Sequence, residues 1–113
     1  MGRAAALTDP AVVRALRSIH GDPARAWTVA ELGTGAGLSR AAFARRFAGL
    51  AGEPPLTYVI RWRMTTASRM LRESDAPLTL VARRCGYTSE YAFAKAFKRE
   101  FGRVRRSQKC RPD

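Results

Sequence analysis

One short passage occurs twice in this chain. The first copy lies within residues 29–47 and the second within residues 78–97. Gly86 follows Gly37 by 49 residues, whereas Phe93 follows Phe43 by 50, because the second copy has one extra residue just after its turn. Two short helical patterns joined by a turn that contains glycine are typical of a helix-turn-helix. The sequence therefore predicts two such units, which favours an elongated, non-palindromic target bound by a single protomer.

The charge of the chain points to a polyanionic partner. The 113 residues carry a formal net charge of +12, and the basic residues are mostly Arg. The planar Arg guanidinium donates two parallel hydrogen bonds, which suits phosphate groups and guanine edges. A charge excess without an acidic run favours nucleic acid, although a solubilising surface or a ribosome-like basic protein would show the same balance.

Several classes of protein do not fit this composition. Two cysteines, Cys85 and Cys110, are too few for a secreted disulfide scaffold, and we expect Cys85 to be packed and Cys110 to be a free thiol. A single His makes a zinc site improbable, so no metal and no cofactor is expected. No segment reaches the ~18 apolar residues that span a membrane, and residues 1–7 are too short for a signal-peptide core. We expect a cytoplasmic, nucleoid-associated protein.

Residues 1–54 are predicted to form the first subdomain, with three helices. Asp9 caps the first helix, Thr28 and Glu31 form a capping box for the second, and Ser39 caps a third that runs to about Leu50. Gly33 and Gly35 should each cost roughly 1 kcal/mol against Ala inside a helix, which predicts a softer first unit. The side chains expected to face inward are Val12, Val13, Leu16, Ile19, Val29, Leu32, Ala36, Phe43, Phe47 and Leu50.

Residues 55–74 are predicted to form a long linker helix. Its apolar stripe contains Leu56, Ile60, Met64, Ala67 and Leu71, widened by Tyr58, Val59, Trp62 and Met70. A helix that is apolar on two sides can serve two small cores. About 20 residues at 1.5 Å each span about 30 Å, which is close to one turn of B-DNA, ~34 Å. This length would suit two helices held in successive major grooves.

Residues 75–102 are predicted to form the second subdomain and residues 103–113 a flexible basic tail. The fifth helix ends at Gly86, and Ser89 caps a sixth helix that runs to about Phe101. The side chains expected inward are Leu78, Val81, Ala82, Cys85, Phe93, Phe97 and Phe101. The predicted fold class is all-α, with two helix-turn-helix subdomains joined by a linker helix and six to seven helices in all.

Several passages in the joining helix and the second copy match a known pattern. They are Arg61-Trp62-Arg63-Met64, Leu71-Arg72-Glu73-Ser74, the run from Val81 to Phe93, and Phe97-Lys98-Arg99-Glu100-Phe101-Gly102. Together with the repeat, residues 9 to 102 resemble the C-terminal DNA-binding domain of the AraC family of bacterial transcription regulators. The resemblance implies seven helices in two subdomains, with the third and sixth helices in adjacent major grooves.

The chain departs from the family pattern in two places. Family members usually have a Pro and a Tyr-Arg after the last Phe-Gly, where this chain has Arg105 and Gln108-Lys109, so a seventh helix after Gly102 is left open. Family members also usually carry an effector-binding or dimerisation domain before this one. Only about eight residues precede Asp9 here, so we expect either an isolated fragment of a longer regulator or a naturally short regulator.

The resemblance implies a set of DNA-binding residues on the two recognition helices. Arg45 is the best candidate for a guanine contact, because its fork matches O6 and N7. Glu90 can accept from a cytosine amino group or can stabilise the helix dipole. Ala41 and Ala44 offer only apolar contacts, which favours DNA-shape readout there. The first face is Ser39, Arg40, Ala41, Ala44 and Arg45, the second is Ser89, Glu90, Tyr91, Ala92 and Lys95, and the phosphate contacts are Arg46, Lys95, Lys98 and Arg99.

The expected function is sequence-specific binding of double-stranded DNA in transcription regulation, and the resemblance implies contact with RNA polymerase. A basic protein that binds nucleic acid without specificity is the alternative, since the first face has few base-reading polar groups. An enzyme is not expected, because the chain lacks the cysteine cluster of methyl-transfer repair proteins that share this motif pair. Tyr58 and Trp62 could contact a protein partner from an exposed face of the long helix, but aromatic residues at helical spacing more often fill cores.

Overall fold

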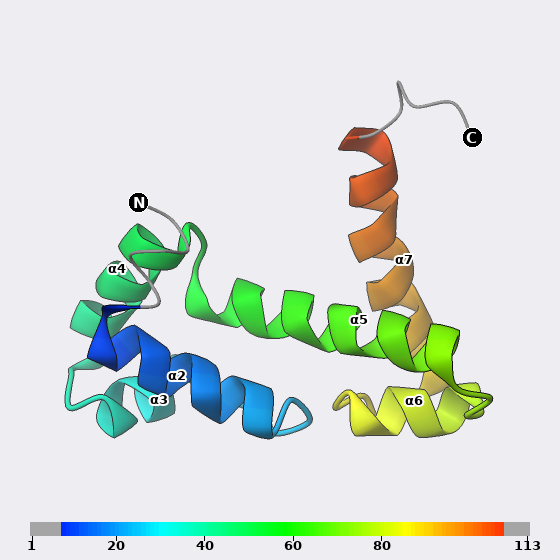
Figure 1. Ribbon diagram of the computed structural model, residues 1–113, viewed down its shortest axis with the longest axis horizontal. Helices are drawn as coiled ribbons and strands as arrows, with labels where there is room; N and C mark the ends of the chain where they lie inside the picture. The colour runs from blue at the N-terminus through cyan, green and yellow to red at the C-terminus, as the bar shows by residue number, and fades with distance from the viewer. Residues whose placement is uncertain (1–7, 108–113) are drawn as a thin grey trace. The chain divides into compact units, whose positions relative to one another are not determined.

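The computed structural model describes residues 8–107, and within that range it contains six helices and no strand (Figure 1). The all-α prediction is confirmed. The calls on residues 1–7 and on Cys110 lie outside the described residues. The helices are α2 (Pro10–Gly21), α3 (Val29–Gly35), α4 (Arg40–Ala51), α5 (Pro55–Glu73), α6 (Leu78–Arg84) and α7 (Glu90–Ser107).

The chain forms two compact units that divide within α5, between Trp62 and Arg63. Unit 1 contains α2, α3, α4 and the first half of α5. Unit 2 contains the second half of α5 together with α6 and α7. Where the sequence suggested a separate linker segment, each half of α5 thus belongs to the unit that it packs into.

Side-chain caps begin the helices of unit 1 as predicted. Asp9 accepts hydrogen bonds from the backbone N–H groups of Ala11 and Val12, at 3.0 and 3.2 Å. Thr28 and Glu31 form the reciprocal capping box, with both hydrogen bonds at 3.0 Å. These caps satisfy N–H groups that have no partner within the helix, and each stabilises its helix start by about 1 kcal/mol.

The core of unit 1 lies among all four of its helical segments. Tyr58 and Trp62 pack against this core, as the core-filling interpretation expected. Leu56 and Ile60 are exposed, so their predicted inward position is wrong. Burying the two aromatic side chains removes more apolar surface from water than burying the two aliphatic ones. The buried hydrophobic residues of this core are Val12, Ala15, Ile19, Leu32, Phe43, Phe47 and Val59.

The turns of the two repeats are closed by the same set of backbone hydrogen bonds. The N–H of Leu38 donates to the carbonyl of Gly33 at 2.8 Å, and the N–H of Tyr87 donates to that of Ala82 at 2.9 Å. Gly37, just before Leu38, has a positive φ angle of 75°, and Gly86, just before Tyr87, has one of 90°. A left-handed glycine with such a bond is the usual way to end a helix sharply. The repeat in the sequence is therefore a repeat in backbone structure.

Gly33 allows close packing between α3 and α4, which its low helix propensity alone did not predict. It is buried, and a Cβ added there would lie 3.1 Å from the carbonyl oxygen of Leu38 and 3.3 Å from the Cβ of Phe43. The absent side chain lets the end of α3 approach the start of α4 closely. At Gly35 the same added atom would meet nothing within 4 Å.

The core of unit 2 is smaller. Its buried residues are Met64, Ala67, Val81, Ala82, Cys85 and Phe93, with Phe97 and Phe101 packed against them. Leu71 and Leu78 are exposed, which contradicts their predicted inward position. Among the described residues unit 2 has no counterpart of α2, so three helical segments cover a smaller core. Leu71 and Leu78 border an apolar hollow of about 520 Å³ beside Phe97 and Phe101.

The last helix is longer than predicted. α7 runs to Ser107, so the prediction of a tail without helical pattern is wrong for residues 103–107, while residues 108–113 lie outside the described residues. Gly102 is not among the glycines with positive φ, and it continues the helix. Arg, which occurs three times in residues 103–107, is a good helix former.

Candidate nucleic-acid interface

The exposed side of α4 carries the residues predicted for the first reading face. Phe43 and Phe47 are fully buried on one side of this helix. Arg40, Ala41 and Arg45 are exposed and Ala44 is half-buried on another side. Because α4 follows the closed turn directly, this side is the part of unit 1 that a groove could receive.

The predicted site residue Ser39 begins α4 as its cap. Its hydroxyl oxygen accepts the N–H of Ala42 at 3.2 Å. Ser89 does the same for Ala92 at 3.0 Å at the start of α7. The two caps lie 50 residues apart, one more than the glycines of the turns, so the extra residue falls between turn and cap in the second copy. The hydroxyl hydrogen of each serine can still donate to a ligand such as phosphate.

Arg46 has different surroundings from the other predicted site residues of α4. Its Nε donates to Oδ2 of Asp9 at 2.8 Å, which joins α4 to the cap of α2. Arg40 and Arg45, by contrast, make no ion pair within residues 8–102. Partial burial raises the pKa of Asp9, but the backbone N–H groups and Arg46 outweigh that effect, and the pKa lies below its ordinary value of 3.8.

The exposed side of α7 carries the second predicted face. Tyr91 is 73% exposed, and the ammonium nitrogen of Lys95 lies 5.5 Å from its ring centroid in a cation–π contact. Glu90 is the first residue of the helix, where a carboxylate meets the positive end of the dipole. Phe93 is buried on the opposite side. The remaining predicted residues, Ala92, Lys98 and Arg99, are also exposed.

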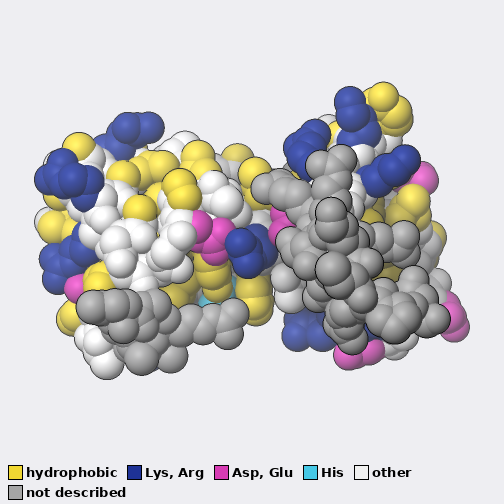
Figure 2. Space-filling model, turned by 90° about the horizontal axis from the view of Figure 1, so that it is seen from above, with side chains coloured by type: hydrophobic (Ala, Val, Ile, Leu, Met, Phe, Trp, Pro, Cys, Tyr) yellow, Lys and Arg dark blue, Asp and Glu magenta, His cyan; other side chains and the backbone are white. Residues whose placement is uncertain are grey.

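Carboxylates of unit 1 are engaged away from the reading face. Glu31 pairs with Arg25 at 2.8 Å, and Glu53 pairs with Arg61 at 3.1 Å. Hydrogen bonding and the charge of Arg25 lower the pKa of Glu31. Figure 2 shows Lys and Arg side chains on both units, with fewer acidic side chains among them. Arg40 and Arg45 of α4 therefore keep an uncompensated positive charge, whereas the charge of Arg46 is paired with Asp9.

The sequence analysis predicted Asp9 as a helix cap but not as the ion-pair partner of Arg46. Asp9 and Arg46 lie 37 positions apart, and no local pattern links them. It also missed the surroundings of His20, whose ring stacks on Trp62 at 4.0 Å between centroids and whose Nε2 lies 2.6 Å from the Tyr58 hydroxyl. Desolvation lowers the pKa of His20 below its ordinary value of 6.5.

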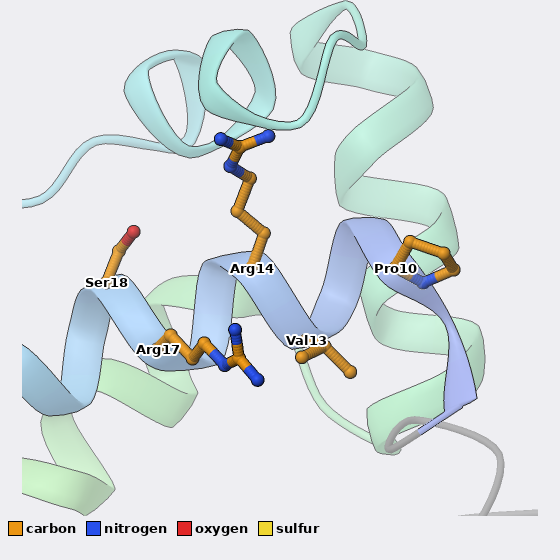
Figure 3. A pocket seen from close by; sticks show the side chains of 5 residues that line it. All are labelled: Pro10, Val13, Arg14, Arg17 and Ser18. Atoms are coloured by element: carbon orange, nitrogen blue, oxygen red, sulfur yellow. The ribbon is translucent and has the colours of Figure 1, made fainter.

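The side chains around the hollow on α2 do not converge, and the described residues hold no metal-binding group. A shallow hollow of about 580 Å³ lies along α2, but Figure 3 shows Arg14 and Arg17 leaving the helix in different directions instead of converging. Within residues 8–107 no group of three or more His, Cys, Asp or Glu side chains could hold a metal ion. Burial raises the pKa of the Cys85 thiol, which disfavours the reactive thiolate. No described helix has the length and apolar character to cross a bilayer.

Comparisons with known proteins agree with this geometry. A family model described as a helix-turn-helix domain matches residues 32–104. The DNA-binding domain of AdpA, a global transcriptional factor solved in complex with a target DNA, matches with a TM-score of 0.73 and 28% identity. The match covers 93% of this chain and all of that one. A Streptomyces antibioticus protein described as an AraC-like transcription regulator is 48% identical to this chain over 101 residues. This chain is an AraC-type helix-turn-helix domain. The predicted family is confirmed.

The curated relatives are bacterial proteins that are much longer than this chain. The match to the Streptomyces antibioticus protein covers 89% of this chain and 33% of that protein. The regulator AlkR of Acinetobacter baylyi is 38% identical over 96 residues, or 85% of this chain and 31% of that protein. This AraC-type domain thus spans about a third of the length of these curated relatives.

Proposed function

We propose that this chain binds double-stranded DNA in a sequence-specific way as the DNA-binding domain of a transcription regulator. The observation that carries the proposal is the repeated turn. Each copy is closed by the same hydrogen bonds and is followed by a helix with exposed basic residues. In this proposal α4 and α7 are the recognition helices and occupy successive major grooves. The AdpA domain, solved with its target DNA, supports it by similarity.

Arg45 is proposed as the main base-reading residue of unit 1. It is exposed and has no ion pair among the described residues, so its planar fork is available to guanine O6 and N7. Ala41 and Ala44 bring little bulk to the same side of α4, which lets the helix lie close to thymine methyl groups or to a groove of suitable shape. Ser39 and Arg40 flank this contact.

Unit 2 is proposed to read DNA with a different set of groups. Tyr91 and Lys95 form one exposed cluster on α7, and Ser89 and Ala92 lie at its start. Glu90 can accept a hydrogen bond from a cytosine amino group or can stabilise the start of the helix. Lys98 and Arg99, one turn further along, are proposed to contact phosphates together with Lys95.

The specificity of binding tests the proposal directly. Duplexes retained by the chain from a random pool would be sequenced, and the affinity for the selected duplex would be compared with that for a scrambled duplex at one fixed salt concentration. We expect the selected duplex to bind about 10³-fold tighter or more. Equal affinities would favour the alternative, a basic protein that binds nucleic acid without specificity.

Footprinting on the selected duplex tests the arrangement of the two helices. We expect protection of two major-groove segments about one helical turn apart on the same side of the DNA. Protection of a single groove segment would contradict the proposal that α4 and α7 both read DNA.

Contacts with partners other than DNA are proposed from the family resemblance alone. A regulator of this family would act at the bacterial chromosome, hence in the cytoplasm, and would touch RNA polymerase at its promoters. An effector-binding or dimerisation domain would act together with this domain, and no cofactor is proposed. Protein cross-linking on a promoter fragment with purified RNA polymerase would test the polymerase contact, and the absence of any cross-link would argue against it.

A further inference from the structure

Asp9 performs two tasks with its two carboxylate oxygens. Oδ1 accepts the N–H groups of Ala11 and Val12 and so caps α2. Oδ2 accepts a hydrogen bond from Nε of Arg46 on α4 at 2.8 Å. The Asp9 side chain is only 13% exposed, whereas the Arg46 side chain is 47% exposed. The ion pair is therefore covered at its acidic end and open at its basic end.

The remaining donors of Arg46 are available. A guanidinium has five N–H donors in a fixed plane, and the contact with Asp9 uses the one on Nε. Among the described residues no other partner is recorded for Arg46. The four N–H donors of its two terminal amino groups remain, on a side chain that is 47% exposed. Arg46 directly follows Arg45, the proposed base-reading residue of the same helix.

We infer that Asp9 is a positioning residue for DNA binding, which holds the Arg46 guanidinium in place so that its terminal amino groups bind a backbone phosphate beside the groove occupied by α4. This inference rests on the proposed function. A long side chain that is already oriented loses less conformational freedom when it binds. The fixed plane also suits a bidentate contact with a phosphate.

The Asp9–Arg46 pair has no equivalent in the described part of unit 2. The position that corresponds to Arg46 in the second repeat, 50 residues later, is Ala96, a half-buried residue that packs against the core of unit 2. The described part of unit 2 also has no counterpart of α2 and hence no capping carboxylate at the matching place. The effect of disrupting the pair should therefore be restricted to the part of the DNA that unit 1 contacts.

The direction in which one substitution changes the DNA affinity distinguishes this inference from a simple effect of net charge. Asp9→Asn keeps an oxygen that can cap α2 equally well, but it removes the charged acceptor for Arg46. Because the variant gains one unit of positive charge, charge alone predicts tighter DNA binding. We expect instead a loss of affinity of roughly three- to tenfold for every sequence, as for the loss of about one oriented hydrogen bond.

The control removes the same charge elsewhere. Asp75→Asn changes an exposed residue between α5 and α6 that makes no ion pair in the described part of the chain. We expect this variant to bind DNA as tightly as the unmodified chain or slightly more tightly. Affinities would be measured by fluorescence anisotropy with the selected duplex, and thermal unfolding would check that each variant is folded.

A second variant tests the phosphate contact without touching the cap. Arg46→Ala should weaken binding to all sequences about equally and should lower the slope of log affinity against log salt by about one. Adding Asp9→Asn to Arg46→Ala should cause no further loss, because the oriented group is already absent. A purely structural ion pair would lower stability in Arg46→Ala and leave the salt slope unchanged.

Two results would overturn the inference. One is Asp9→Asn binding as tightly as the unmodified chain or more tightly, and the other is an unchanged salt slope in Arg46→Ala. In both cases the unmodified chain would still prefer its selected duplex, so the proposed function would stand. Failure of the unmodified chain to prefer any duplex would instead remove the proposed function itself.

Discussion

Arg45 and Arg46 are adjacent on α4, yet their guanidinium groups have different surroundings. Arg45 has no ion-pair partner in the described part of the chain, whereas Arg46 is fixed to Asp9. The sequence analysis assigned Arg45 to a guanine contact and Arg46 to a phosphate contact. It did not predict the ion pair of Arg46, because the Asp9 carboxylate reaches Arg46 only through the packing of α2 against α4. A pairing set by tertiary contact has no local sequence signal.

Arg45→Ala is expected to cost about 1–3 kcal/mol of binding free energy for the selected duplex and to relax the preference at one base pair, because a bidentate base contact is lost. Binding to duplexes that vary at each position would measure this change. Lys98→Ala is the matched comparison and should weaken binding to all sequences about equally. A changed base preference in Lys98→Ala would show that its assignment as a phosphate contact is wrong.

His20 predicts a pH dependence of the stability of unit 1. Since desolvation lowers the pKa of the folded His20 below 6.5, the folded state favours the neutral ring. Its contribution to stability is present above the unfolded pKa and is lost as the pH falls through the folded pKa. Urea unfolding followed by Trp fluorescence should therefore show lower midpoints in mildly acidic buffer, and His20→Gln should reduce this dependence. An equally steep decline in the variant would assign it to other groups.

At the scale of helices, the starts were predictable and several buried faces were not. A cap depends on residues two or three positions apart, so Asp9, Thr28 and Ser39 were predictable directly from the sequence. Which side of α5 is buried depends on the neighbouring helices. For that reason the inward prediction failed for Leu56, Ile60 and Leu71, and for Leu78 on α6. The end of α7 was also missed, because Gly102 stops a helix only when it takes a positive φ.

The two glycines of α3 should respond differently to the same substitution. Gly35→Ala is expected to raise the free energy of unfolding by about 0.4–1 kcal/mol, because open space surrounds that position and alanine restricts the unfolded chain. Gly33→Ala should give a smaller gain or a loss, because its new methyl group would press on the backbone at Leu38 and Ser39. Chemical unfolding of both variants measures the difference. A larger gain at position 33 than at 35 would contradict this account.

At the scale of the whole chain, the repeat predicted two units that share one long helix, and the contacts bear out two compact units. The halves of α5 enter separate cores, with Val59 buried in unit 1 and with Met64 and Ala67 buried in unit 2. Each unit therefore has its own core and its own proposed recognition helix. The DNA-binding residues themselves stay a prediction, since the sequence and the fold indicate exposed positions but not which bases meet them.

Damage to one core should remove one half of the DNA contact. Phe93→Ala should destabilise unit 2 by about 3–5 kcal/mol, because it leaves a cavity at a fully buried side chain. On the selected duplex this variant should lose protection of one groove segment and keep the other. Phe47→Ala is the matched variant in unit 1 and should show the reverse pattern. Loss of both segments in both variants would indicate that the two units act only together.

The hydrogen bonds that close both turns have a consequence for how such a domain can change its target. These hydrogen bonds join backbone atoms, and the turns require glycine at positions 37 and 86 for their positive φ angles. The exposed side chains of α4 and α7 take no part in these bonds. The backbone atoms that close each turn and the side chains proposed to read DNA are thus different parts of the same repeat. Under the proposed function, substitutions on the exposed side of α4 or α7 would change the DNA sequence that one unit binds and would leave both turns intact.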